Sequence, residues 1–150
     1  MKLQIKWTEG MKFQAQADAN STMMDAKSPI GTNTAMTPKE LVGAGLAGCT
    51  AMDVIALLKK HKQAYTALNV DVDISTSTSG QPVIFTNAVL TFLAEGDIKP
   101  EILLEAVKLS QTKYCGVSAM LVKAFPIKYI VQLNGEKIGE GMAEFGELHG

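Results

Sequence analysis

Arginine is absent from this 150-residue sequence, so all 14 of its basic side chains are lysines. Arginine binds carboxylates and oxyanions through two parallel hydrogen bonds, and the compact ammonium group of lysine cannot reproduce that geometry. With 15 acidic residues, the formal net charge is −1. Because no basic patch typical of a nucleic-acid-binding or membrane-surface protein is present, we expect neither nucleic acid nor a membrane as a partner.

Long apolar runs are also missing. The sequence has no uninterrupted stretch of about 18 apolar residues, so we expect no transmembrane helix. Residues 1–7 alternate between polar and apolar and lack the apolar core of a signal peptide, which favours a cytoplasmic protein. Without internal repeats or a linker, a chain of this length predicts one domain, residues 1–150, with a substantial core.

Only two cysteines are present, Cys49 and Cys115. In the cytoplasm such a pair argues against a static disulfide and indicates free or redox-cycling thiols, although cysteine is also a common buried residue and the alternative for each is an inert core thiol. His61 and His149 lie at a charged helix end and in the tail, so we expect no metal site and no Cys–His dyad. No phosphate-binding loop, HExxH motif or nucleophile elbow occurs, and we expect no cofactor.

Residues 37–62 predict one long helix that is apolar nearly all round. Thr37 and Glu40 have the spacing of a capping box, and the intervening proline suits the first helical position. A helix of this composition is buried in a core or between subunits. Three glycines in its first half each cost about 1 kcal/mol relative to alanine. We interpret them as sites where another backbone approaches closely: Gly43, Gly45 and Gly48.

Period-two patterns predict the strands. Residues 2–7 and 11–17 form a hairpin whose face of Leu3, Ile5 and Trp7 is half-buried, and residues 21–25 add a short third strand before an ordered loop. The remaining elements are strands at 68–74 and 83–93, a helix from residue 100 that breaks at 115–116, a short helix at 117–124, a strand at 127–133 and a brief return at 136–138. The order βββ-α-ββ-α-β indicates an α+β fold, with an antiparallel sheet packed on two long helices.

Two motifs resemble those of the OsmC/Ohr family, the osmotically induced protein C and organic hydroperoxide resistance proteins. The first is Thr-Pro-x-Glu-Leu before the small-residue helix that carries Cys49, and the second is Tyr-Cys-Gly-Val-Ser around Cys115. The resemblance extends over nearly the whole chain. It implies an OsmC-like fold and an intertwined homodimer with two equivalent sites at the subunit interface.

The resemblance also implies an activity. It makes Cys49 the peroxidatic thiol and Cys115 the resolving thiol of a reductase for organic hydroperoxides, and sometimes hydrogen peroxide, with a cellular dithiol as the reductant. The sequence departs from the family peroxidases in several places. Lys39 stands where they have a glutamate, Glu40 follows one residue later, their N-terminal arginine is missing, and Cys115 precedes glycine instead of proline.

Polar residues close to Cys49 each have a functional and a structural interpretation. Glu40 is a catalytic carboxylate or the capping-box partner of Thr37, and its spacing favours the cap. Asp53, one helical turn after Cys49, disfavours a thiolate there unless a cation intervenes, or it is structural and accepts hydrogen bonds from the backbone or Thr50. We expect Lys39 to take over part of the electrostatic role of the absent arginine.

Two functions of different classes follow. The first is thiol-dependent hydroperoxide reduction in oxidative-stress defence, in which Cys49 and Cys115 form a disulfide during turnover. The alternative is a non-catalytic OsmC-like protein that binds a small apolar ligand in the cleft at the dimer interface. The missing arginine favours the binding protein, whereas the retained pair of thiols favours the enzyme.

Overall fold

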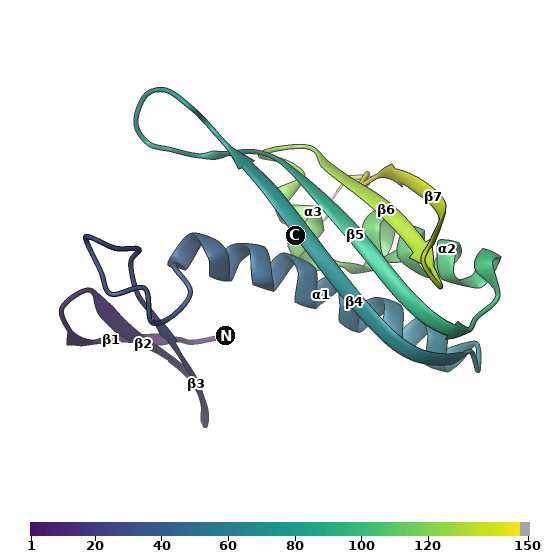
Figure 1. The fold of residues 1–150 in the computed structure, drawn as a ribbon, viewed down its shortest axis with the longest axis horizontal. Helices are drawn as coiled ribbons and strands as arrows, with labels where there is room; N and C mark the ends of the chain where they lie inside the picture. The colour runs from purple at the N-terminus through teal and green to yellow at the C-terminus, as the bar shows by residue number, and fades with distance from the viewer. Residues whose placement is uncertain (148–150) are drawn as a thin grey trace. The chain divides into compact units, whose positions relative to one another are not determined.

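The computed structural model describes residues 1–147 and contains two compact units, one formed by residues 1–44 and the other beginning at Gly45 (Figure 1). Helix α1, Pro38–Lys60, begins in the first unit and continues into the second. One domain over residues 1–150 stays a prediction. His149 lies outside the described residues.

The first unit contains a three-stranded antiparallel sheet. Its strands are β1 (Gln4–Glu9), β2 (Lys12–Ala17) and β3 (Asn20–Met24), in the order β1-β2-β3. Gly10 takes a positive φ of 51° in the first turn, which glycine adopts at little steric cost. The hairpin predicted from alternation and the short third strand predicted after it are both present, with bounds shifted by one or two residues.

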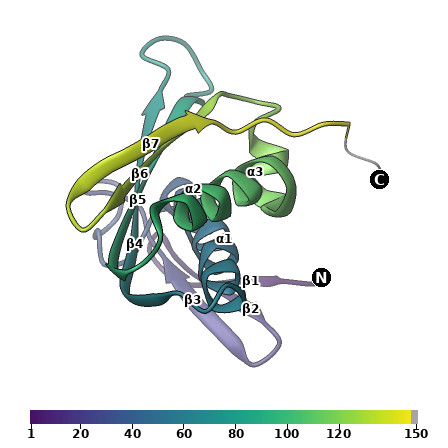
Figure 2. The same ribbon diagram turned by 90° about the vertical axis from the view of Figure 1, so that its right-hand side faces the viewer.

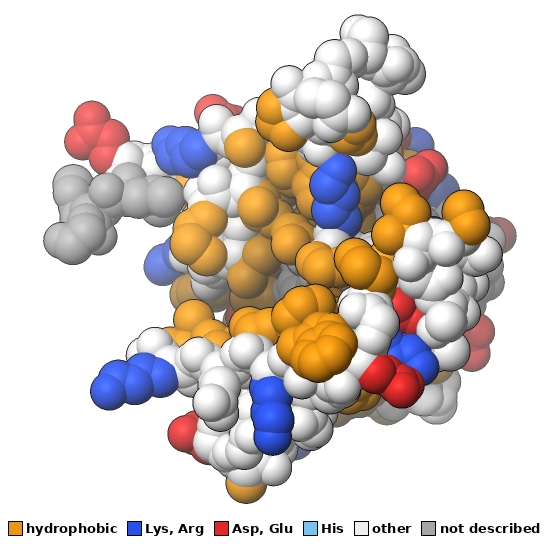
Figure 3. Space-filling model, turned by 90° about the vertical axis from the view of Figure 1, so that its left-hand side faces the viewer, with side chains coloured by type: hydrophobic (Ala, Val, Ile, Leu, Met, Phe, Trp, Pro, Cys, Tyr) orange, Lys and Arg blue, Asp and Glu red, His pale blue; other side chains and the backbone are white. Residues whose placement is uncertain are grey.

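The apolar face of β1 is exposed. Leu3, Ile5 and Trp7 expose 57%, 53% and 60% of their surface, so the prediction that this face is half-buried is wrong for the single chain. Hydrophobic side chains are prominent on the surface shown in Figure 3. Soluble proteins rarely leave contiguous apolar surface uncovered, and such surface commonly marks an interaction site.

Asp25 organises the predicted loop between β3 and α1. Only 2% of its surface is exposed. Its carboxylate accepts hydrogen bonds of 2.7–3.2 Å from the backbone N–H groups of Ala26, Thr32 and Thr34 and from both threonine hydroxyls. These bonds, with the Thr34 amide contributing most, hold the pKa of Asp25 well below its usual range. Gly31 is required beside it, because a Cβ there would collide with the Ala26 carbonyl.

The second unit is built on a four-stranded mixed sheet. Its strands are β4 (Ala64–Thr76), β5 (Phe85–Asp97), β6 (Ile127–Leu133) and β7 (Glu136–Met142), in the order β4-β5-β6-β7. The predicted α+β class is confirmed, but β5 and β6 pair in parallel, so the sheet is not purely antiparallel. A parallel pair needs a long crossover, which is supplied here by the helices between β5 and β6. β7 is a full strand where only a brief return was predicted.

The crossover consists of α2 (Pro100–Leu109), a π-helix η1 (Ser110–Tyr114) and α3 (Gly116–Leu121). Figure 2 shows α2 and α3 on one face of the β4–β7 sheet. Fully buried side chains from helices and strands form the core between them. Its largest members include Leu46, Leu58, Leu90, Phe92, Leu103 and Ile127.

Helix α1 is far less buried than its composition predicted. An 18-residue window of it has a mean hydropathy of 1.9, and only 28% of that window is buried. By length and composition alone α1 is apolar enough to cross a membrane, but core helices of soluble proteins share these properties, so the expectation of no transmembrane helix stays a prediction. A Cβ at Gly45 or Gly48 would meet no atom within 4 Å, so the expected close backbone approach at these two glycines is not made by the described part of this chain.

Candidate active site

Three reactive side chains meet in the second unit. Cys49 and Asp53 lie one turn apart on α1, and positions four residues apart share a face of a helix. Cys115 reaches the same place from the end of the π-helix. The two Sγ atoms and a carboxylate oxygen of Asp53 all lie within 4.8 Å of one another. The fold thus brings together two cysteines that are far apart in sequence, as predicted.

The backbone around Cys115 fixes the direction of its thiol. The residue leaves the π-helix with an extended backbone (φ −70°, ψ 101°), which agrees with the break predicted from Cys115 and Gly116. Its N–H donates to the Ser110 carbonyl at 2.9 Å. Its Sγ accepts a hydrogen bond of 3.3 Å from the Ser118 N–H, so a thiol caps the start of α3. π-Helical turns occur frequently at functional sites.

The two thiols have different environments. Cys115 is fully buried, whereas Cys49 is half-buried. Burial raises the pKa of the Cys115 thiol to about 11; hydrogen bonds with Ser118 oppose this rise, and the neighbouring Cys49 adds to it. The Cys115 thiol therefore keeps its proton at neutral pH, while Cys49 is the more accessible of the two sulfurs.

A buried chain of hydrogen bonds leads to Asp53. Ser110 Oγ donates to Asp53 Oδ2 at 2.9 Å, the hydroxyls of Thr50 and Ser110 are 2.7 Å apart, and Gln111 Nε2 donates to Thr50 Oγ1 at 2.8 Å. Since a carboxylate only accepts, the chain runs in one direction, from Gln111 through Thr50 and Ser110 to Asp53. It connects α1 to the π-helix and holds the Asp53 carboxylate beside the thiols.

This network was largely missed from the sequence. Thr50 or the backbone was expected to donate to Asp53, but the donor is Ser110, with Thr50 one step further along. Thr50, Ser110 and Gln111 are all fully buried. The available signal was a pair of polar residues, Ser110 and Gln111, directly after the apolar stripe of the second helix, and no role was predicted for either of them.

Glu40 and Lys39 lie in the first turn of α1, within the first unit. The Thr37 N–H donates to Glu40 Oε2 at 2.7 Å and the Glu40 N–H donates to Thr37 Oγ1 at 3.2 Å, so the expected capping box is present. Lys27 Nζ lies 2.8 Å from Glu40 Oε1, and this contact, followed by that with Thr37, lowers the pKa of Glu40. Both Glu40 oxygens therefore have structural partners. Catalytic roles for Glu40 and Lys39 stay predictions.

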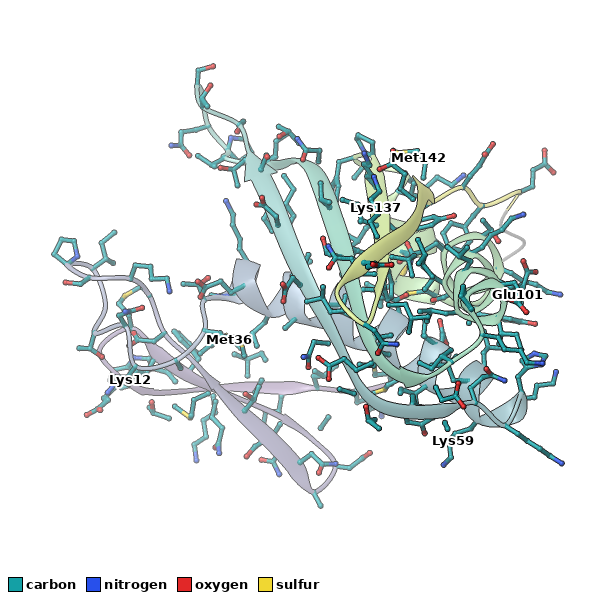
Figure 4. All side chains as sticks on the ribbon, turned by 45° about the vertical axis from the view of Figure 1, so that its right-hand side comes forward. Lys12, Met36, Lys59, Glu101, Lys137 and Met142 are labelled. Carbon is teal, nitrogen blue, oxygen red and sulfur yellow. The ribbon has the colours of Figure 1, made fainter. Side chains whose placement is uncertain are left out.

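A hollow separate from the Cys49–Asp53–Cys115 cluster lies where the C-terminal part of α1 meets α2. It has a volume of about 250 Å³ and is lined by side chains that include His61, Glu101 and Leu109. Figure 4 marks Lys59 near the end of α1 and Glu101 at the start of α2. His61 is exposed there, as expected, and is not a member of the Cys49–Asp53–Cys115 cluster.

Comparisons with known proteins agree with the fold and motifs. A family model described as OsmC-like protein matches residues 31–130. Protein YhfA of Escherichia coli K12 is 34% identical over 131 residues, which cover 86% of this chain and 95% of that protein.

Solved structures give the same result for the fold. An OsmC-like protein from Mycoplasma pneumoniae superposes with a TM-score of 0.77 at 18% identity, covering 88% of this chain and 95% of that chain. An organic hydroperoxide resistance protein OsmC from Legionella pneumophila has a TM-score of 0.66 at 15% identity, covering 88% and 97%. At such low sequence identities, these two structural similarities show a shared fold and not a shared function.

Proposed function

Because the chain belongs to the OsmC-like protein family, whose members include peroxide-resistance and redox proteins, we propose that it reduces organic hydroperoxides with Cys49 and Cys115 as a redox pair. The observation that carries this proposal is the approach of the two sulfurs to within 4.8 Å. An inert core thiol needs no second thiol beside it. The difference in burial supports a role for the half-buried Cys49 in attacking the substrate and for the buried Cys115 in resolving the product.

In the first step, the Cys49 thiolate attacks one oxygen of the hydroperoxide. A sulfur–oxygen bond forms, the oxygen–oxygen bond breaks, and the alkoxide leaves and takes up a proton to become an alcohol. The sulfur is oxidised to sulfenic acid, while the hydroperoxide is reduced.

In the second step, the sulfur of Cys115 attacks the sulfenic sulfur of Cys49. A disulfide forms, and the departing hydroxide combines with the Cys115 proton to give water. A disulfide bond requires about 2.0 Å between the sulfurs, so the thiols have to close by less than about 3 Å. A dithiol reductant then restores both thiols by exchange and is itself oxidised to a disulfide. We place this cycle in the cytoplasm, where such reductants keep thiols reduced.

We also propose that the active protein is a homodimer. Two features of the single chain support this: the exposed apolar face of β1, and the open space above Gly45 and Gly48 on a helix that is largely unburied. In the proposed dimer, a second copy of the chain covers both features with its own apolar surface. Lys39 is proposed to supply positive charge in place of the missing arginine.

The decisive experiment measures the consumption of cumene hydroperoxide and hydrogen peroxide by reduced protein with a dithiol reductant. Cys49→Ser should abolish consumption. Cys115→Ser should still form the Cys49 sulfenic acid, detectable with a dimedone-type probe, but not the disulfide. After one equivalent of hydroperoxide, peptide mapping of the wild-type protein should show a Cys49–Cys115 bridge that dithiothreitol removes.

Two outcomes would contradict the enzyme. One is equal consumption by wild type and Cys49→Ser. The other is persistence of both free thiols in excess hydroperoxide. Either result would favour the alternative, a protein that binds a small apolar ligand without redox chemistry.

A further inference from the structure

We propose that Cys49, Asp53 and Cys115 bind one divalent transition-metal ion when both thiols are reduced, and that zinc is the ion the site fits best. The proposal uses the thiols of the suggested peroxidase but does not depend on peroxide reduction. Cysteine sulfur and aspartate oxygen are both ordinary ligands of zinc, and sulfur ligands select zinc over magnesium or calcium.

The distances are close to those that a metal needs. Tetrahedral zinc with bonds to sulfur of about 2.3 Å places two sulfurs about 3.8 Å apart. The three ligand atoms already lie within 4.8 Å of one another, so each pair has to close by no more than about 1.3 Å. Cys49 and Asp53 stand one turn apart on one face of α1, which keeps two of the ligands in a fixed relation.

Hydrogen bonds from outside the cluster orient two of the three ligands. Ser110 Oγ donates to Asp53 Oδ2 at 2.9 Å, which leaves the other carboxylate oxygen for a metal. The Ser118 N–H donates to Cys115 Sγ at 3.3 Å and directs the sulfur. Partners of this kind are a regular feature of metal sites, and their loss typically weakens metal binding about 10- to 100-fold.

Binding of a divalent cation at this place leaves the net charge of the site unchanged. The partner of the Asp53 carboxylate is the neutral hydroxyl of Ser110, and the chain has no arginine. When zinc binds, each thiol gives its proton to solvent, so two protons are released per ion. The ion and its three anionic ligands then carry a net charge of −1, which is the charge of the aspartate alone.

Three protein ligands leave the fourth tetrahedral position to a water molecule. A bound ion would occupy both sulfurs, so metal binding and disulfide formation exclude one another. The site would then exist in two protected states, one with the metal bound and one oxidised. Zinc should therefore slow the oxidation of both cysteines.

The test uses the untagged, fully reduced chain under anaerobic conditions. Zinc affinity is measured by competition with a chromophoric chelator, and cobalt binding by its thiolate charge-transfer absorption. Wild type should bind one ion per chain with that absorption. Cys49→Ser, Cys115→Ser and Asp53→Asn should each bind at least about 10-fold more weakly, by analogy with the losses seen at other metal sites. The matched control is Asp71→Asn, because Asp71 is an exposed carboxylate on β4, and it should bind like wild type.

A second measurement needs no variant. Zinc added to wild type should slow the alkylation of both cysteines by N-ethylmaleimide, followed by mass spectrometry. The proposal is overturned if wild type binds no zinc, if Asp53→Asn binds as tightly as wild type, or if zinc leaves both alkylation rates unchanged. Because neither assay contains peroxide, a failure here is distinct from a failure of the proposed reductase.

Discussion

The two units of the chain are stabilised by different forces. Every member of the buried hydrophobic core belongs to the second unit, from Leu46 to Ala143. In the first unit, the buried side chain that organises the loop is a carboxylate, and the apolar face of β1 is exposed. A segment of about 40 residues cannot usually bury enough apolar surface to fold alone. The first unit therefore depends on polar contacts and on whatever covers its apolar face.

This difference predicts different sensitivities. A hydrophobic core responds to lost volume, because packing leaves few ways to fill a cavity. A carboxylate that holds a loop responds to protonation, because the protonated form no longer favours the same donors. Phe92→Ala and Asp25→Asn test these two sensitivities directly.

The largest effect is expected from Phe92→Ala in the second unit. Phe92 is fully buried on β5, so its removal leaves a cavity and should lower the free energy of unfolding by about 3–5 kcal/mol. Urea denaturation followed by circular dichroism measures this. Ile84→Ala is the control, since Ile84 is 56% exposed, and it should change stability by less than about 0.5 kcal/mol. Equal losses in both variants would argue against the core as described.

The next effect concerns Asp25 and pH. Its pKa is lower in the folded protein than in the unfolded chain, where it is about 3.9. The stabilisation is therefore complete above the unfolded value and is lost as the pH falls below it towards the folded value. Hydrogen exchange at the Thr32 and Thr34 amides should accelerate on acidification below about pH 4 relative to intrinsic exchange.

Asp25→Asn should expose these amides at neutral pH and remove the acid dependence. Asp18→Asn is the matched control, because Asp18 is exposed and asparagine tolerates its positive φ of 52°. If the exchange of these two amides, corrected for intrinsic exchange, did not change at all between about pH 5 and about pH 2, other contacts would have to hold the loop.

A smaller effect, of opposite sign in monomer and dimer, is expected from Gly45→Leu. In the single chain the added side chain meets no atom at its Cβ and should favour the helix by about 1 kcal/mol. If a second copy packs there, overpacking should instead weaken the dimer by about 1–3 kcal/mol. Sedimentation across a range of concentrations separates the two cases. Gly45→Ala should show the same helix gain with a weaker effect on the dimer.

The smallest effect is expected at the start of α1, within the first unit. Thr37→Ala removes the side-chain acceptor for the Glu40 N–H and should cost about 1 kcal/mol. Thr37→Ser keeps the acceptor and should be nearly neutral. Thermal unfolding of the two variants measures the difference, and equal melting temperatures would show that the cap contributes nothing.

Much of the fold could be predicted from local patterns. The signals at Thr37, Pro38 and Glu40 located the start of α1, and alternation located β1, β2, β4 and β6. Period-two alternation gives the two faces of a strand but not its neighbour. For that reason the parallel pairing of β5 with β6 was missed. The exposure of Trp7 was missed for a related reason, since a pattern identifies an apolar face without identifying what covers it.

The site was predictable in part. Cysteine chemistry pointed to Cys49 and Cys115, and helical spacing placed Asp53 beside Cys49. The inward positions of Ser110 and Gln111 could not be predicted in the same way, because a helical wheel of 3.6 residues per turn does not describe a π-helix. Their burial depends on that local change in the helix.

The π-helix also makes this segment sensitive to the loss or gain of a single residue. An exposed loop usually tolerates a lost or gained residue, because its ends stay where the flanking elements hold them. Between Ser110 and Tyr114 a deletion would instead return the wide turn to an ordinary α-helical turn, and the inward positions of Ser110 and Gln111 depend on that wide turn. The hydrogen bonds that lead from Gln111 to Asp53 would then be broken, although the segments on either side would keep nearly the same direction. Related chains can therefore vary in residue type along this turn more easily than in residue number.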